Sequence, residues 1–154
     1  MIKRKGFTLV ELLIVVVIMG VLTSMMSISS VGSTDSAKAS AIIGNLVTMR
    51  KAALADYIEN GDTNWTDADS VREAIAAYMN TKETAITAAK FSVLKQDAWY
   101  ILYEFQTDDS SSVKDKIAGK ANLTGLYAAT AATTVTNNIY TNVANNTHVA
   151  IKVR

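Results

Sequence analysis

Residues 1–29, which read MIKRKGFTLVELLIVVVIMGVLTSMMSIS, decide how this chain is organised. Three basic residues come first, Lys3, Arg4 and Lys5, and no charged residue occurs from Leu12 to Thr34. The stretch from Phe7 to Ile28 is long enough to cross a bilayer as a helix, which takes about 20 residues. Because a basic cluster is retained in the cytoplasm, we expect the remainder of the chain to point outward.

Two ordinary explanations of this segment are incomplete. A secretory signal peptide also has basic residues and an apolar run, but this run is too long and no clear small-x-small cleavage pattern follows it. A plain membrane anchor does not explain Glu11, because a carboxylate in a spanning helix costs about 2.5–3.5 kcal/mol on insertion scales. Glu11 therefore indicates a function and a partner, unless its side chain reaches the membrane interface.

The string GFTLVELLIVVVIMG, residues 6–20, resembles the processing signal of type IV pilins and type II secretion pseudopilins. The matching elements are the short basic leader, Gly6, Phe7, Glu11 and a charge-free run that contains Gly20. The resemblance implies that a prepilin peptidase cuts after Gly6 and methylates the new amine of Phe7. It also implies that Glu11 pairs with the terminal amine of a neighbouring subunit and sets the register of assembly. Opposite buried charges are tolerable only when they are paired.

Two features of the family are missing from this chain. Many members carry a proline where Ile28 stands here, and the chain contains no proline or cysteine. Any break in the first helix must then come from glycine and serine, with Gly20 and Gly32 as the candidates, or the helix is straight. Without cysteine, a disulfide is impossible, and the domain must be held together by packing.

Beyond Thr34 the apolar residues become one-sided. From Phe7 to Asn60 we expect a single helix, ended by Asn60-Gly61-Asp62. The apolar face of its second half has helical spacing and comprises Ala39, Ile43, Leu46, Ala53, Leu54, Tyr57 and Ile58. Lys38 and Asp56 are among the polar residues expected to lie away from that face.

The remaining elements are predicted from shorter signals. A second helix is expected over 67–79, with a capping box of Ser70 and Glu73, and a third over 113–120, capped by Ser112. Residues 80–97 are ambiguous, and within them 85–95 fit either a short helix or a strand. Strands are expected over 98–105, in mid-sheet, and over 139–143 and 147–153. The Ala/Thr-rich stretch 128–136 is most simply an exposed loop.

The side chains that could react or bind a ligand do not form a recognisable catalytic set. His148 is predicted on the solvent face of a terminal strand, and Asp108-Asp109 in a solvated loop that lacks the spaced ligands of a calcium site. Asp67 and Asp69 are predicted to start a helix. The aromatic residues Trp65, Trp99, Tyr100 and Tyr103 are expected to pack in the core. We therefore expect no enzyme activity, no cofactor and no metal.

These observations predict an α+β fold in which a long N-terminal helix packs on a small antiparallel sheet, a plan that is also similar to pilins. The expected parts are a cleaved leader, 1–6, a membrane or filament-core half-helix, 7–34, and a globular domain, 35–154. The net charge of +1 argues against nucleic-acid binding.

The expected function is that of a type IV pilus subunit, with a pseudopilin of a secretion or competence apparatus as the alternative and a signal-anchored binding protein as a third reading. The resemblance implies as partners further copies of the chain, the inner membrane, prepilin peptidase, an assembly ATPase and a platform protein. It also implies a location first in the inner membrane and then in a surface filament.

Overall fold

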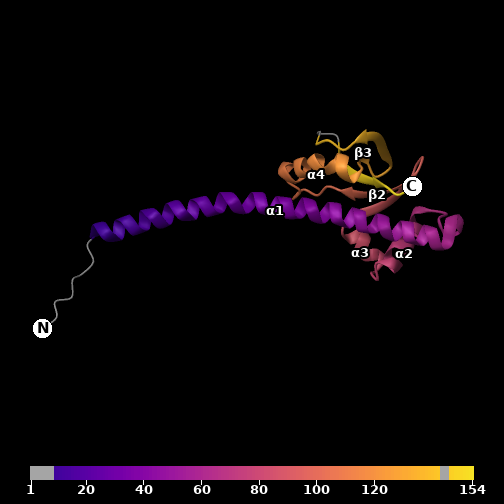
Figure 1. Cartoon of the computed structure of the whole chain (residues 1–154), viewed down its shortest axis with the longest axis horizontal. Coiled ribbons are helices and arrows are strands. Elements are labelled where there is room, and N and C mark those ends of the chain that lie inside the picture. Colours follow the sequence, from indigo (N-terminus) through magenta and orange to yellow (C-terminus); the bar gives the residue numbers. More distant parts are fainter. Residues whose placement is uncertain (1–8, 143–145) are drawn as a thin grey trace. The chain divides into compact units, whose positions relative to one another are not determined.

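The computed structural model of the protein describes residues 9–142 and 146–154, without the side chains of residues 22–31, 62, 64 and 137. The chain divides into two compact units, Met1–Thr34 and Asp35–Arg154. Helix α1 (Leu9–Asn60) begins in the first unit and ends in the second (Figure 1). It is continuous past Gly20, Ile28 and Gly32, so any flexibility at the two glycines stays a prediction.

The end of α1 lies where the sequence predicts it. Asn60 is its last residue, and Gly61 follows with φ +66° at the start of the 3₁₀ turn η1 (Gly61–Asn64). This left-handed conformation carries a steric cost for most residues but not for glycine. The local sequence signal therefore terminates the helix here.

The second unit contains an antiparallel sheet of five strands. The strands are β1 (Phe91–Lys95), β2 (Trp99–Glu104), β3 (Leu126–Ala131), β4 (Thr134–Ile139) and β5 (His148–Lys152), in the order β1-β2-β5-β3-β4. Strand β2 lies inside the sheet and is buried over five of its six residues, as its apolar sequence predicts. The α+β prediction is confirmed.

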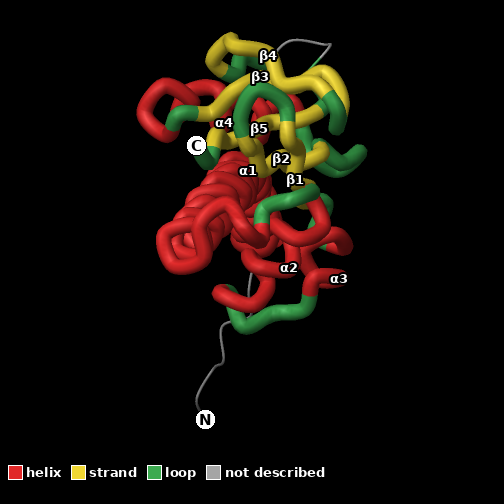
Figure 2. Tube along the Cα trace, turned by 90° about the vertical axis from the view of Figure 1, so that its right-hand side faces the viewer, coloured by secondary structure: helices red, strands yellow, loops and turns green. Residues whose placement is uncertain are grey.

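The main core forms between the second half of α1 and one face of the sheet. Side chains on that face include Ile101 of β2 and Ile151 of β5, and they share a cluster with Leu46 of α1. Within this unit, α4 (Ser111–Thr124) and the sheet lie along one side of α1, and α2 (Ala68–Tyr78) and α3 (Glu83–Ala88) along the other (Figures 1 and 2). The buried apolar residues that α1 contributes to this core are Ala39, Ile42, Ile43, Leu46, Met49, Ala52 and Ala53.

The helix starts differ from the predictions in their capping residues. Asp67, not Ser70, caps α2, because its carboxylate accepts a hydrogen bond from the backbone N–H of Ser70 at 2.8 Å. Ser110, not Ser112, caps α4 by accepting one from the N–H of Val113 at 3.2 Å. A cap must stand just outside the helix to reach these amides, and both predicted caps lie inside. Asp67 and Asp69 do start a helix, as predicted.

The prediction of a loop over residues 128–136 is wrong, although the exposure predicted for it is confirmed for residues 130–134. Most of this stretch belongs to β3 and β4, and Ala128 and Ala129 are buried. Low complexity gave no indication that this stretch pairs with β5, where Ala128 is opposite Val149. The strand expected over 139–143 is also wrong in its described part, because only Ile139 is in a strand, as the last residue of β4.

Near the end of α1, Ile58 was predicted on the apolar face and Asp56 away from it, and the structure shows the reverse. Ile58 is 82% exposed, whereas Asp56 is buried. The Asp56 carboxylate accepts hydrogen bonds from Nε1 of Trp65 at 2.6 Å and Nδ2 of Asn60 at 2.7 Å. A buried carboxylate is tolerated when it is hydrogen-bonded, and periodicity cannot reveal that a tryptophan nine residues away supplies the donor.

Replacing Leu46, which is fully buried, by alanine should lower the free energy of unfolding by about 2–5 kcal/mol, through lost burial and the cavity left behind. The matched change Ile58→Ala, on the exposed side of the same helix, should cost less than about 0.5 kcal/mol. Urea denaturation of the full chain in detergent, followed by tryptophan fluorescence, measures both. Equal losses in the two variants would contradict the core described here.

Candidate functional site

The apolar first part of α1 is exposed over its described side chains. Every large apolar residue from Leu9 to Val21 has between 42% and 82% of its surface accessible. Full burial of one such side chain contributes about 1.5–3 kcal/mol. A helix that is apolar all round is normally covered by other structure or by lipid. This surface is therefore a candidate site for association.

Glu11 lies in the first turn of α1, and its side chain is exposed. Glu11 is the only charged residue between Leu9 and Thr34. The predicted leader and cleavage residues Lys3, Arg4, Lys5, Gly6 and Phe7 lie outside the described residues, so their predicted roles and the pairing of Glu11 stay predictions.

Among the residues that the structure describes, no helix combines the length and the apolarity needed to cross a membrane. The predicted span from Phe7 to Ile28 stays a prediction.

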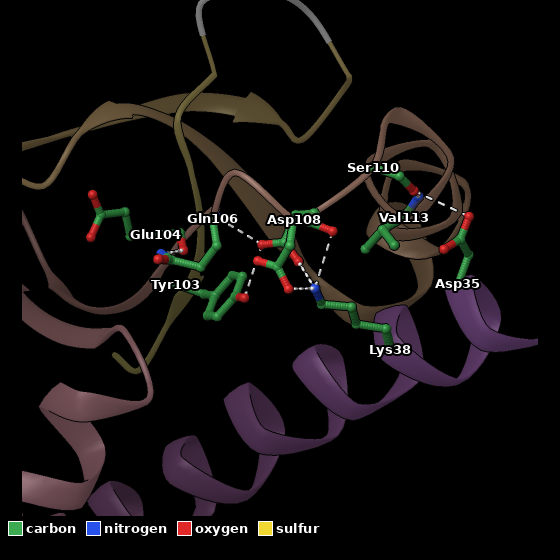
Figure 3. A network of polar contacts seen from close by, with 9 residues as sticks. Asp35, Lys38, Tyr103, Glu104, Gln106, Asp108, Ser110 and Val113 are labelled. Atoms are coloured by element: carbon green, nitrogen blue, oxygen red, sulfur yellow. Dashed lines mark hydrogen bonds and ion pairs between the residues drawn. The ribbon is translucent and has the colours of Figure 1, made fainter. Parts of the chain in front are cut away.

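A polar cluster fixes the beginning of the second unit (Figure 3). The Lys38 ammonium lies 2.7 Å from Oδ2 of Asp108 and 2.8 Å from Oδ1 of Asp109. The Asp109 side chain has no exposed surface, and its Oδ2 also accepts hydrogen bonds from the Tyr103 hydroxyl at 2.9 Å and the Gln106 N–H at 2.7 Å. The prediction of a solvated Asp108-Asp109 loop is therefore wrong for Asp109.

The charges in this cluster change the ionisation of their neighbours. Hydrogen bonds from Lys38 hold the pKa of Asp108 below its usual range, and both aspartates raise the pKa of Lys38. Burial, followed by the hydrogen bond to Asp109, raises the pKa of Tyr103. The ion pair that causes the shifts of Lys38 and Asp108 joins α1 to the β2–α4 connection, 70 residues further along the chain. Sequence reasoning missed this pair because no local pattern links Lys38 to Asp109.

His148 is buried, which corrects its predicted place on the solvent face. Its strand, β5, lies between β2 and β3 and is buried on both faces. Burial lowers the pKa of His148, and its Nδ1 lies 2.8 Å from the hydroxyl oxygen of Thr147. The residue is more simply part of the sheet than part of a reactive site.

The aromatic residues considered as candidate site residues lie in the core of the fold. Trp65, Trp99, Tyr100 and Tyr103 are buried, as predicted for core residues. Within residues 9–142 and 146–154, no group of three or more histidine or carboxylate side chains is placed to hold a metal ion. The association surface on α1 is thus the stronger candidate.

Asp109→Ala should lower the free energy of unfolding by about 1–3 kcal/mol for each donor that loses its acceptor, namely the buried Tyr103 hydroxyl and the half-buried Gln106 N–H, while Lys38 keeps its pair with Asp108. The adjacent Asp108, whose side chain is 76% exposed, gives the matched control, and Asp108→Ala should be nearly neutral. Thermal and urea unfolding of both variants test this difference. Similar stabilities would show that the buried carboxylate does not anchor α1.

Comparison with known proteins adds one match, at the segment that carries α1's exposed apolar surface. Neither the curated proteins nor the solved structures include a match to this chain. Residues 1–27 match the family model described as the prokaryotic N-terminal methylation motif. This motif is the signature of type IV pilins and pseudopilins. It supports the interpretation that the chain is a substrate of prepilin peptidase. The chain therefore carries, at its N-terminus, the processing signal of the pilin and pseudopilin type.

Proposed function

We propose that this protein is the structural subunit of a type IV pilus filament. The observation that carries the proposal is the exposed apolar surface of α1 from Leu9 to Val21, which lies within the matched processing motif, residues 1–27. A surface of this kind requires a cover, and further copies of the same helix provide one. The chain itself performs no catalysis.

Before assembly, the chain is held in the inner membrane. The apolar stretch from Phe7 to Ile28 lies in the bilayer, and the basic residues Lys3, Arg4 and Lys5 remain in the cytoplasm. Prepilin peptidase cuts after Gly6 and methylates the amine of Phe7. This step removes three cations and places a single positive charge at the start of the helix that remains.

Assembly then exchanges lipid for neighbouring helices. The apolar halves pack as a central bundle, and the second units cover the filament surface. The Glu11 carboxylate of one copy pairs with the Phe7 amine of its neighbour. Because each of these charges is costly when buried alone and tolerable when paired, the pair selects one axial register for the helices. An assembly ATPase and a platform protein drive the process from the cytoplasmic side.

A pseudopilin of a type II secretion or competence apparatus is the second candidate, because the matched motif is common to both types. The Thr-, Ala- and Asn-rich C-terminal half favours an exposed filament surface and hence a pilin. Shearing filaments from cells and identifying their main protein separates the two candidates: abundance in long surface filaments supports the pilin, and absence supports the pseudopilin.

Processing is tested by mass spectrometry of the assembled protein. We expect loss of residues 1–6 and one methyl group on Phe7. The change Gly6→Val should retain the leader, because it places a bulky β-branched side chain beside the bond that is cut. An intact Met1 in assembled wild-type protein would refute the processing step.

Glu11→Ala should leave membrane insertion intact and reduce filament yield by tenfold or more, on the order expected when a buried charge loses its partner. Glu59→Ala on the same helix, in the second unit, removes one carboxylate and serves as the matched control. Membrane fractionation and quantification of sheared filaments are the measurements. Normal yield from Glu11→Ala would exclude the pairing role.

A further inference from the structure

Strand β4 forms one edge of the sheet, since among the described residues the order β1-β2-β5-β3-β4 leaves it with β3 as its only neighbouring strand. An edge strand presents unpaired N–H and C=O groups that a strand from another chain is able to use. Natural proteins commonly block such edges. The backbone of β4 at Val135 is blocked by a side chain.

The side-chain amide of Gln96 makes two hydrogen bonds with the backbone of Val135. Its Oε1 accepts from the Val135 N–H at 2.9 Å, and its Nε2 donates to the Val135 carbonyl at 3.2 Å. In an antiparallel sheet, a hydrogen-bonded residue pair exchanges one N–H and one C=O in the same way. The Gln96 amide thus occupies the place of a peptide group in a sixth strand.

Packing holds Gln96 in this position. Gln96 begins the connection between β1 and β2, and its own N–H donates to the Ala98 carbonyl at 2.9 Å. Leu94 and Ala98, on either side of Gln96, pack against a second cluster that contains Tyr100, Val135 and other residues of the sheet. The β1–β2 connection therefore contacts the strand at the opposite edge, and the sheet is curled.

The two faces of β2 show how this curl arises. Ile101 and Tyr103 belong to the main core against α1, whereas Tyr100 and Leu102 belong to the second cluster. The second face is covered by the sheet's own curl, with Val135 from β4 among its buried side chains. Gln96 lies at the point where this curl closes.

We propose that Gln96 is a lock on the β4 edge that prevents this edge from pairing with the β4 edge of a second copy. The two hydrogen bonds satisfy the groups that such pairing would use, and the packing of Leu94 and Ala98 keeps the amide in place. Release of Gln96 exposes Val135 for strand addition. The lock is a property of the second unit and operates whether or not the chain forms filaments.

The first test is hydrogen exchange of the Val135 amide in the full chain in detergent micelles. In Gln96→Ala, this amide should exchange about tenfold faster than in the wild type, through loss of its acceptor and local opening of the edge. The matched control is Gln106→Ala, which removes another glutamine side chain bonded to a backbone carbonyl, that of Glu104 at 2.7 Å. Unchanged exchange at Val135 in Gln96→Ala overturns the proposal.

The second test measures association through β4. The chain contains no cysteine, so Thr134→Cys, at an exposed position beside Val135, supplies a single site for a short bis-maleimide. Adding Gln96→Ala should raise the yield of cross-linked dimer several-fold, whereas adding Gln106→Ala should not. Faster exchange at Val135 without extra dimer would overturn the claim that the lock prevents association.

A second substitution covers the case in which Gln96→Ala fails to fold, as judged by tryptophan fluorescence. Gln96→Glu keeps the length and the acceptor for the Val135 N–H, but replaces the donor to the Val135 carbonyl by an oxygen that repels it. In the Thr134→Cys background, folded Gln96→Glu should give more cross-linked dimer than Thr134→Cys alone, with a smaller change in Val135 exchange than full loss of the acceptor causes. A dimer yield equal to that of Thr134→Cys alone overturns the proposal.

Discussion

Helix α1 must be covered in two different ways, and the rest of the structure depends on this constraint. Its second half has an apolar side that fills the space against the sheet, with Leu46 fully buried. Its first half has apolar side chains on every side, and from Leu9 to Val21 all of them are exposed. Apolar area gains stability only when it leaves water. The first half therefore requires a cover of a different kind, which the proposed bundle of helices supplies.

Polar contacts keep the second half of α1 in register with its own unit. Lys38 reaches the buried Asp109, and Asp56 accepts the indole N–H of Trp65. Both carboxylates are removed from water and are acceptable there because each has several donors. Packing alone tolerates small shifts of a helix along a sheet, whereas these directional bonds favour one position. The same logic applies at the far edge of the sheet, where the amide of Gln96 fits one residue of β4.

The local signals that predicted the fold correctly are those in which the residues of one segment alone determine its conformation or its burial. Asn60-Gly61 ends α1 because glycine accepts a left-handed conformation, and β2 is a mid-sheet strand because its side chains are apolar on both faces. The failures have a different cause. Ala128, Asp109 and His148 were predicted to be exposed, but each is buried by partners distant in the sequence. The composition of a segment, or the alternation of apolar and polar residues along a strand, describes that segment alone. It carries no information about which other parts of the chain cover the segment.

The sequence by itself determined the processing signal, the charge-free run with Glu11 inside it, and the class of fold, because these depend on short-range spacing and on the length of an apolar stretch. Only the tertiary structure decided which polar residues are buried, which serines and aspartates cap the helices, and where the sheet curls on itself. Lys38 and Asp109, or Gln96 and Val135, are brought together by the folding of whole elements. Their distances follow from the packing of the second unit, and no local pattern encodes them.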